Sequence, residues 1–464
     1  MDKELTSQLP PSIKEGYRFT TTDHKPVSQD LIFKLLEQEK AELSKNLASH
    51  SQHQSATIYT PLGVQSSFQF YKPFPINIKS ASGAYLKDVD NRKILDLSMG
   101  FGAMLAGHLN PQVILDIQEA LREGTLYVAP SPLAQQASAS ISKRFNISWV
   151  RFANSGTEAV MYAVRLAKVH SGKEGVVKIE GGYHGSADSV NFSVKPSKFT
   201  TEPQPIPGSL SGLSFAVPYN DLQTLEDLFK TYSSDLACFI LEPVIENLGI
   251  ILPDQGYLQK VRELCDKYNV ILIFDEVKTG LTAGPQGAAQ RLGVTPDLIC
   301  LAKSIAGGIP LAAFGGKEEF YQTIDSGKMA HYGTFNGHNL GMAALLSMDK
   351  IISTQALQKA EALNLQALTK IHDIIQEYQL PAHALGFGLK GAISWSPTPL
   401  RNYKDWKLNT NFALAELSFF WSLNNLIMTP PGQDDQWLIS LAHDQEEIDL
   451  IVQDFLSLAK ALRS

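Results

Sequence analysis

Short apolar runs that alternate with helical segments constrain the fold of this chain most strongly. Between about residues 110 and 320 they recur at 150–154 (VRFAN), 176–181 (VVKIEG), 238–244 (CFILEPV), 270–277 (VILIFDEV) and 298–303 (LICLAK). Runs of this length separated by helices are typical of a largely parallel sheet that is buried on both faces. The sequence therefore predicts an α/β fold in which helices flank a mostly parallel sheet.

The chain is long enough for two packed subdomains, because 464 residues exceed the length at which one core usually stops growing. We expect residues 1–56 to form a polar N-terminal extension with one helix, between Gln29 and Ala48. Residues 57–109 are expected to begin a small domain with the hairpin YLKDVDNRKILDLS, and residues 110–340 to form the large domain. The remaining residues, 341–464, are expected to form an α+β C-terminal small domain. The stretch from Lys195 to Gly212 is a candidate lid.

Charge and cysteine usage favour a small-molecule enzyme of the cytoplasm. The net charge is −7 without long basic blocks, which argues against nucleic acid or anionic membrane as a partner. The three cysteines, Cys238, Cys265 and Cys300, lie in apolar runs and predict reduced core thiols, neither a disulfide framework nor a metal site. The sequence contains neither a signal-peptide pattern nor an apolar stretch of about 18 residues that would span a bilayer.

Two segments of the predicted large domain place small or aromatic residues at strand ends. The run VRFAN leads into 155–158 (SGTE) and then an amphipathic helix, whose first N–H groups can bind an anion. The same four residues also fit an ordinary capping box. At 181–185 (GGYHG), the ring of Tyr183 either stacks on a flat ligand or packs at the turn.

Asp275 and Lys303 each close an apolar strand. Asp275 lies at the carboxyl edge of the sheet, where open α/β folds bind ligands, and either caps the next segment or holds a protonated ring nitrogen. Val277, on the same face, could cover one side of that ring. Lys303 either reaches the surface or serves as a neutral amine that forms imines. A polar loop at 331–337 (HYGTFNG) offers Thr334 as a phosphate ligand or as part of a plain turn.

In this order and spacing, the motifs resemble those of the class III aminotransferases, which are fold type I enzymes that use pyridoxal 5′-phosphate (PLP). The resemblance covers roughly residues 60–460. Its blocks are RFANSGTEAVMYAVRLAK, EGGYHGSAD, ILEPV, IFDEVKTG, GVTPDLICLAKSIAGGIPLAAFGG and GTFNGH. It implies a large domain with a mostly parallel sheet and a smaller α+β domain.

The resemblance also implies a role for each motif residue. Lys303 is expected to carry PLP as a Schiff base, Asp275 to hold the pyridine nitrogen, Tyr183 to stack on the ring and Val277 to cover its other face. The further cofactor contacts that it implies are Ser155, Gly156, Thr157, His184, Glu242 near the ring oxygen and, from the other subunit, Thr334. A homodimer follows from the last assignment.

Within the family, the GGYHGSAD block and the lead-in PLGVQSSFQF are most similar to glutamate-1-semialdehyde 2,1-aminomutase and the aminotransferases close to it. The chain departs from that pattern because Gln69 stands where the pattern has a substrate-binding arginine, although Ser66 keeps the nearby serine. The stretch 99–102 (MGFG) replaces a tryptophan-bearing G-S-W-G, and Asp435 stands in place of a pocket glutamate. Glutamine cannot hold a carboxylate with two parallel hydrogen bonds as arginine does.

We therefore expect an aminotransferase that moves an amino group from a small-molecule donor to a carbonyl acceptor by ping-pong kinetics, in specialised metabolism. Its acceptor pocket is expected to involve Ser66, Gln69, Phe101 and Asp435. One alternative is an aminomutase that keeps the amino group on one carbon skeleton. The other is a non-catalytic scaffold with a PLP-enzyme fold, against which the intact set of Lys303, Asp275 and Tyr183 argues.

Overall fold

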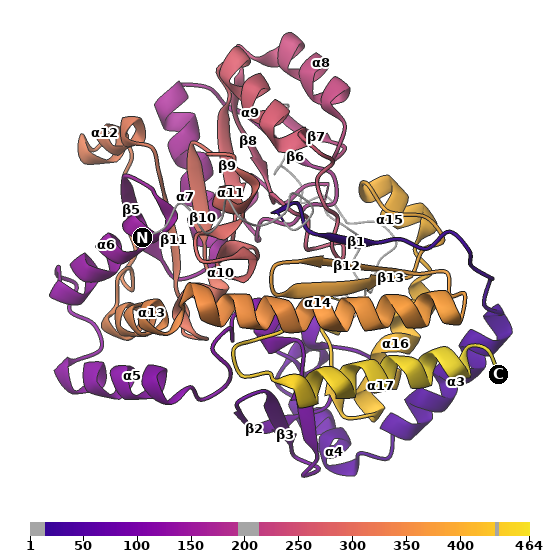
Figure 1. Ribbon diagram of the computed structural model, residues 1–464. Helices are drawn as coiled ribbons and strands as arrows, with labels where there is room; N and C mark the ends of the chain where they lie inside the picture. Colours follow the sequence, from indigo (N-terminus) through magenta and orange to yellow (C-terminus); the bar gives the residue numbers. More distant parts are fainter. Residues whose placement is uncertain (1–13, 194–212, 432–435) are drawn as a thin grey trace.

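A seven-stranded sheet forms the centre of the molecule (Figure 1). The computed structural model describes residues 14–193, 213–431 and 436–464. The strand order is β5-β11-β10-β9-β8-β6-β7, and only β11 runs antiparallel to its neighbours. The bounds are β5 (Trp149–Ala153), β6 (Gly175–Ile179), β7 (Ser214–Val217), β8 (Leu236–Leu241), β9 (Ile271–Asp275), β10 (Leu298–Leu301) and β11 (Ala312–Gly316). The predicted α/β class with a mostly parallel sheet is confirmed.

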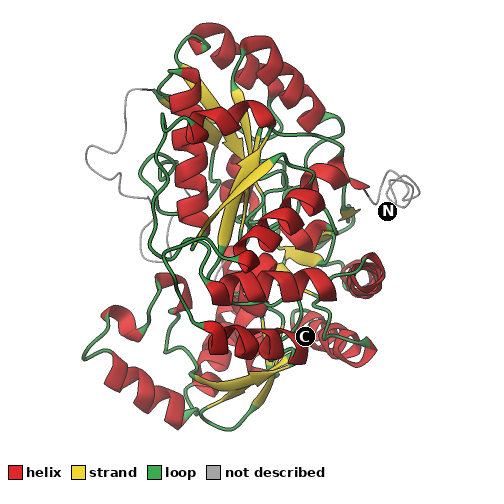
Figure 2. Ribbon diagram, turned by 90° about the vertical axis from the view of Figure 1, so that its left-hand side faces the viewer, coloured by secondary structure: helices red, strands yellow, loops and turns green. Residues whose placement is uncertain are grey.

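Alternate residues of the central strands enter two different cores, as the two-residue period of a strand requires. In β9, Ile271 and Ile273 pack on the side of α7 (Gly156–Ser171), whereas Leu272 and Phe274 pack on the side of α8 (Leu222–Tyr232) and α9 (Tyr257–Tyr268). Figure 2 shows helices on both sides of this sheet. The same period places Asp275, the last residue of β9, on the α7 face.

Two smaller sheets complete the fold. The first is antiparallel, in the order β1-β12-β13-β15, and the second has the order β14-β4-β3-β2. Their strands are β1 (Tyr17–Phe19), β12 (His383–Phe387), β13 (Lys390–Ser394), β15 (Gln436–Leu438), β14 (Ile427–Met428), β4 (Lys93–Asp96), β3 (Tyr85–Asp88) and β2 (Ile78–Ser82). The predicted hairpin is the pair β3–β4, and its turn places Asn91 in the left-handed region.

The N-terminal segment differs from the single helix that we expected. From residue 14 on, it includes two helices, α3 (Gln29–Leu43) and α4 (Leu47–Ala56), and α3 packs against α16 (Phe412–Asn424). The expected helix ends early because the polar stretch 44–46 interrupts its apolar face. In addition, β1 pairs with β12, which lies more than 360 residues further along the chain. β1 and α3 are therefore built into the C-terminal sheet and helices, whereas α4 contacts η1 and Asp90 in the β3–β4 turn.

The remaining helices cover the sheets and link them. Two long helices of the C-terminal part, α14 (Thr354–Glu377) and α17 (Gln445–Ala461), lie side by side (Figure 1). The others are α5 (Pro111–Glu123), α6 (Pro132–Phe145), α10 (Gly280–Ala283), α11 (Gly287–Leu292), α12 (Tyr321–Asp325), α13 (Asn339–Ile351) and α15 (Tyr403–Asn409); short 3-10 turns are η1 (Pro61–Gly63), η2 (Ser67–Gln69), η3 (Met99–Gly102), η4 (Lys303–Ala306) and η5 (Glu318–Phe320).

All three cysteines lie in described residues, and they are buried and unpaired, as predicted. Within the described part of the chain, no helix combines the length and the apolar character needed to cross a bilayer.

Candidate active site

A cavity of about 770 Å³ opens at the carboxyl ends of β9 and β10, beside the first turn of α7. Eleven residues singled out from the sequence line it: Ser66, Phe101, Ser155, Gly156, Thr157, Tyr183, His184, Glu242, Asp275, Val277 and Lys303. This is the edge of a parallel sheet at which ligands of α/β folds bind.

The N-terminus of α7 forms one wall of the cavity. Ser155 is its N-cap, and the side-chain oxygen of Ser155 accepts a hydrogen bond from the Glu158 N–H at 3.2 Å. Glu158 reaches back to accept the Asn154 N–H at 2.6 Å. The segment is therefore a capped helix start whose Ser155, Gly156 and Thr157 also line the cavity. Capping and anion binding are compatible here, because the first-turn N–H groups exceed what one cap can satisfy.

A buried histidine and a backbone N–H orient Asp275. Nδ1 of His184 lies 2.7 Å from Oδ2 of Asp275, and the Val277 N–H donates to Oδ1 at 3.0 Å. His184 and Asp275 are both buried, and Nε2 of His184 has no hydrogen-bond partner among the described residues. Asp275 thus presents a fixed carboxylate to the cavity, as a group that holds a cationic nitrogen requires.

Lys303 begins η4, separated from the end of β10 by one residue, and has a left-handed backbone, with φ 50. Burial, followed by the nearby charge of Lys390, lowers the pKa of the Lys303 ammonium from 10.5 to about 8. Near pH 7, the neutral fraction of Lys303 is therefore larger than that of an exposed lysine. Only the neutral amine acts as a nucleophile or a base.

Glu242, which follows β8, supplies a second buried carboxyl group. Its Oε2 accepts the Glu246 N–H at 3.0 Å, while its Oε1 has no hydrogen-bond partner in the described part of the chain. Burial raises the pKa of this carboxyl group. A protonated Glu242 could donate a hydrogen bond to a ligand oxygen in the cavity.

Aromatic rings form the outer wall. The rings of Phe68 and Phe101 meet edge to face, with their centroids 4.9 Å apart. Tyr183 is 47% exposed and lines the cavity opposite the sheet end, where its ring can stack on a planar ligand. The ammonium of Lys278 lies 5.9 Å from the centroid of Phe101.

Three residues predicted for the site lie elsewhere or outside the described residues. The Gln69 side chain accepts the Gln65 and Ser66 N–H groups at 3.2 Å as part of a capping box, and Gln69 does not line the cavity. The pattern Ser66-x-x-Gln69 is itself a capping-box signature, so the sequence carried this signal. Thr334 lines a separate cavity of about 320 Å³. Asp435 lies outside the described residues, as does the predicted lid, 195–212.

Several lining residues were not predicted. Asn191, Asn247 and Lys278 bring polar groups to the cavity, and Ile309 and Leu311 bring apolar ones. Lys278 could have been recognised from the sequence, because it is a lysine inside an otherwise buried segment after β9. The two asparagines could not, because they lie in loops whose path depends on tertiary contacts.

Comparison with known proteins places the chain in a family. The family model for class III aminotransferases matches residues 68–408. The chain belongs to the class III aminotransferase family.

Class III relatives match nearly the whole chain. Proteins named glutamate-1-semialdehyde 2,1-aminomutase from Methanocorpusculum labreanum and Methanothrix thermoacetophila are 37% and 34% identical to it. The matches cover 84% and 88% of this chain and 95% of each relative. A solved transaminase with PLP bound is 27% identical, with a TM-score of 0.82, and the match covers 90% of this chain and 97% of that structure.

This class III enzyme is PLP-dependent, and its cavity fits the cofactor. The unpartnered Oε1 of Glu242 and Nε2 of His184 are buried polar atoms that a bound ligand would satisfy or cover. A Cβ added at Gly156 would lie 3.0 Å from the Val277 side chain, so this side chain closely approaches the Gly156 backbone. An anion cradle, a fixed carboxylate and a desolvated lysine are the three groups that a phosphorylated pyridine aldehyde requires.

Proposed function

We propose that this enzyme moves an amino group between neighbouring carbons of one small amino-carbonyl compound, the reaction type named in its curated relatives. The observation that carries the proposal is the convergence of Lys303, Asp275 and the N-terminus of α7 on one cavity. The proposed roles of these residues are the same for any amino-group transfer, so the relatives are what favours the aminomutase.

Each site residue has its own proposed role. Bound PLP supplies an electron-accepting ring that makes a proton on the substrate carbon removable. Lys303 would hold the cofactor and is the neutral amine that would take up this proton and return it. Asp275, oriented by His184, would hold the protonated ring nitrogen. Ser155, Gly156 and Thr157 would hold the phosphate.

Tyr183, Val277 and Glu242 complete the proposed cofactor site. Tyr183 and Val277 would enclose the ring from opposite sides, and Glu242 would donate to its oxygen. Ser66 and Phe101 stand on the outer wall, where the substrate enters. Gln69 is left out of this substrate site because its side chain caps η2.

The sequence motifs favour a transaminase with separate donor and acceptor, whereas the curated relatives support the aminomutase. One observation keeps the transaminase as a second candidate. None of the described residues that line the cavity is an arginine, so a substrate carboxylate would lack a bidentate partner there. The solved transaminase that matches at 27% identity is consistent with this candidate.

The two candidates differ in whether a second substrate is needed. The PLP-loaded enzyme is incubated with glutamate-1-semialdehyde alone, and in parallel with a panel of amino donors without an acceptor. An aminomutase converts the amino-aldehyde without any additive. A transaminase instead leaves it unchanged and releases an oxo product from a donor in an amount no greater than that of enzyme. A cofactor spectrum that responds to neither would refute both.

The dimer is also proposed. Thr334 and Val128 line the same cavity, and Val128 is 79% exposed. Tyr332 and Phe335, which flank Gly333 and Thr334 in the sequence, are 82% and 59% exposed. Large exposed apolar side chains that lie together are typical of a contact surface. If Thr334 serves the partner's phosphate site, mixing Lys303→Ala and Thr334→Ala subunits should regain activity, because one site of the mixed dimer has both native residues. Light scattering that shows a monomer would refute this.

A further inference from the structure

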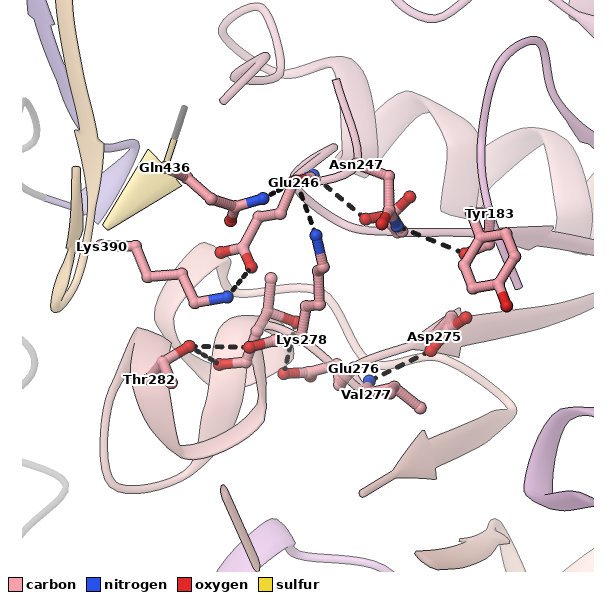
Figure 3. A network of polar contacts seen from close by, with 12 residues as sticks. Tyr183, Glu246, Asn247, Asp275, Glu276, Val277, Lys278, Thr282, Lys390 and Gln436 are labelled. Carbon is pink, nitrogen blue, oxygen red and sulfur yellow. Dashed lines mark hydrogen bonds and ion pairs between the residues drawn. The ribbon is translucent and has the colours of Figure 1, made fainter. Parts of the chain in front are cut away.

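A buried ion pair lies behind the cavity wall (Figure 3). Nζ of Lys390 is 2.6 Å from Oε2 of Glu246, and the two side chains are 2% and 0% exposed. The backbone oxygen of Glu246 accepts Nζ of Lys278 at 2.9 Å and the side-chain amide of Gln436. We call the first two residues the Glu246–Lys390 pair.

Stability does not explain this pair well. Taking two charges out of water costs several kcal/mol, and apolar residues of similar volume often serve a fold as well or better. Glu246 follows β8 of the central sheet, whereas Lys390 begins β13 of the C-terminal sheet. The pair therefore brings two charges from separate sheets to one buried position, which calls for a reason other than packing.

The pair adjoins the cavity through direct contacts. The Glu246 N–H donates to the Glu242 carboxyl group, which lines the cavity. A Cβ added at Gly102 would lie 3.3 Å from Cε and 3.4 Å from Nζ of Lys390. Gly102 ends η3, and η3 packs against η4, which begins with Lys303. The ammonium of Lys390 thus lies one layer of backbone away from the segment that carries Lys303.

Lys303 shares this buried setting with several charged groups, including Lys278, which lines the same cavity. Lys390 lowers the pKa of Lys303, whereas Asp275, Glu242 and Glu246 each raise it, and each has a smaller effect than Lys390. Screening is weak where water is excluded, so a buried cation acts over a longer distance than a surface one.

We propose that Lys390 is a positioning residue for Lys303: its ammonium, anchored by Glu246, opposes a second positive charge on Lys303 and keeps that side chain a neutral amine. The inference rests on the proposed function in that Lys303 is the residue that bonds the cofactor. Glu246 limits the effect, because it both fixes the Lys390 ammonium and offsets part of its charge.

The test follows the reactivity of the Lys303 amine and needs no turnover. Cofactor-free enzyme is mixed with PLP between pH 6 and 10, and the rate of covalent bond formation is followed by absorbance. Borohydride reduction and mass spectrometry identify the modified lysine. The rate rises with the neutral fraction of the amine, so the midpoint of the pH profile reports the pKa of Lys303.

Lys390→Met should move this midpoint to higher pH and slow the reaction at pH 7 by roughly fivefold or more. Lys390→Arg keeps the positive charge and should keep the midpoint. The double variant Lys390→Met/Glu246→Gln removes both charges without leaving an unpaired carboxylate. If the Lys390 charge, and not an unpaired carboxylate, holds the midpoint down, the midpoint of the double variant should stay above that of the wild type.

Two results would overturn the inference: an unchanged midpoint in Lys390→Met, or complete restoration of the wild-type midpoint in the double variant, which would mean that only the unpaired glutamate caused the shift. Circular dichroism of each variant checks the fold. Lys303→Ala separates this inference from the proposed function. If that variant still forms the covalent bond, the assigned lysine is wrong whatever the pair does.

Discussion

A single methyl group added at Gly185 would test how the phosphate cradle is built. Gly185 has φ +90, and a Cβ there would lie 2.5 Å from Oγ1 and 2.7 Å from Cα of Thr157. Thr157 is the proposed phosphate ligand, and its hydroxyl also accepts the Ser186 N–H at 3.2 Å. Gly185→Ala therefore has to displace Thr157 or the loop that carries Tyr183 and His184.

The size of the effect follows from two contributions. A non-glycine residue in the left-handed region costs about 1–2 kcal/mol, and overpacking a close contact costs about 1–3 kcal/mol. We expect Gly185→Ala to destabilise the protein by about 2–5 kcal/mol. Loss of one hydrogen bond to a charged phosphate, worth about 1.5–3 kcal/mol, should weaken PLP binding by roughly tenfold to a hundredfold.

The matched control is Gly172→Ala, at the other end of α7. Gly172 has φ +69, but nothing lies within 4 Å of an added Cβ. It should cost only the backbone contribution of about 1–2 kcal/mol and leave PLP affinity unchanged. Denaturant unfolding and titration of cofactor-free protein with PLP measure both quantities. A Gly185→Ala variant that matches Gly172→Ala in stability and binds PLP within twofold of wild type would refute the proposed cradle.

Three further predictions address charge and protonation. Lys303→Ala should bind PLP without a covalent bond and lose about 10²–10⁴-fold in turnover; a borohydride-stable adduct in this variant would contradict its role. Asp275→Asn should keep the wild-type circular dichroism spectrum but bind PLP about tenfold or more weakly; equal affinity by absorbance titration would exclude Asp275 as the partner of the ring nitrogen. Burial and then His24 lower the pKa of His383 from 6.5 to about 4, and its Nδ1 accepts the Thr21 N–H at 3.1 Å. The unfolded state therefore binds more protons than the folded state between these pH values, so stability should be full above pH 6.5 and fall as the pH drops toward 4. His383→Gln should flatten that decline in urea unfolding, and an unchanged decline would assign it to other groups.

The sequence predicted five of the seven described strands of the central sheet because each is a short apolar run, and it missed β7 and β11. For β11 the reason can be identified. The segment Ala312–Gly316 contains two glycines, which usually indicate a turn. In the structure, a Cβ at Gly315 would lie 2.2 Å from the Trp149 oxygen, and one at Gly316 would lie 2.1 Å from the Asp297 oxygen. The glycines are there because neighbouring backbones approach closely, which no local pattern indicates.

The candidate site was predictable to a similar degree. The residues at strand ends, such as Asp275 and Lys303, could be placed in one cavity because the carboxyl ends of parallel strands share an edge. Contacts between distant segments could not be placed in this way. Glu246 and Lys390 are 144 residues apart, and neither has a local pattern that indicates the other. The expected place of Gln69 in the pocket followed a resemblance to a binding position and left the local capping signal of Ser66 and Gln69 aside, whereas in the structure its side chain caps η2.

Some of the residues with a strained backbone lie at or beside the same cavity, and strain at such a place argues for a functional constraint on its shape. Met99, Phe101 and Lys303 are non-glycine residues in the left-handed region, with φ 44, 55 and 50. Each costs about 1–2 kcal/mol, so the surrounding structure has to hold them. Asp96 does so for η3, because it accepts the Met99 N–H at 2.9 Å and lies 2.7 Å from Nε2 of His108.

This strain has a geometric consequence for the Glu246–Lys390 pair. The left-handed turn at Met99–Gly102 presents Phe101 to the cavity on one side and leaves Gly102 against Lys390 on the other. A regular helix or strand at these positions could not do both, because the two directions depend on successive left-handed residues. If the conformation of η3 keeps the Lys390 charge close to Lys303, a change in that conformation should have the same effect on Lys303 as removal of the charge. Asp96→Asn, which weakens the hold on η3, is then expected to raise the pH midpoint of the Lys303 reaction, and an unchanged midpoint would separate the strain from the charge.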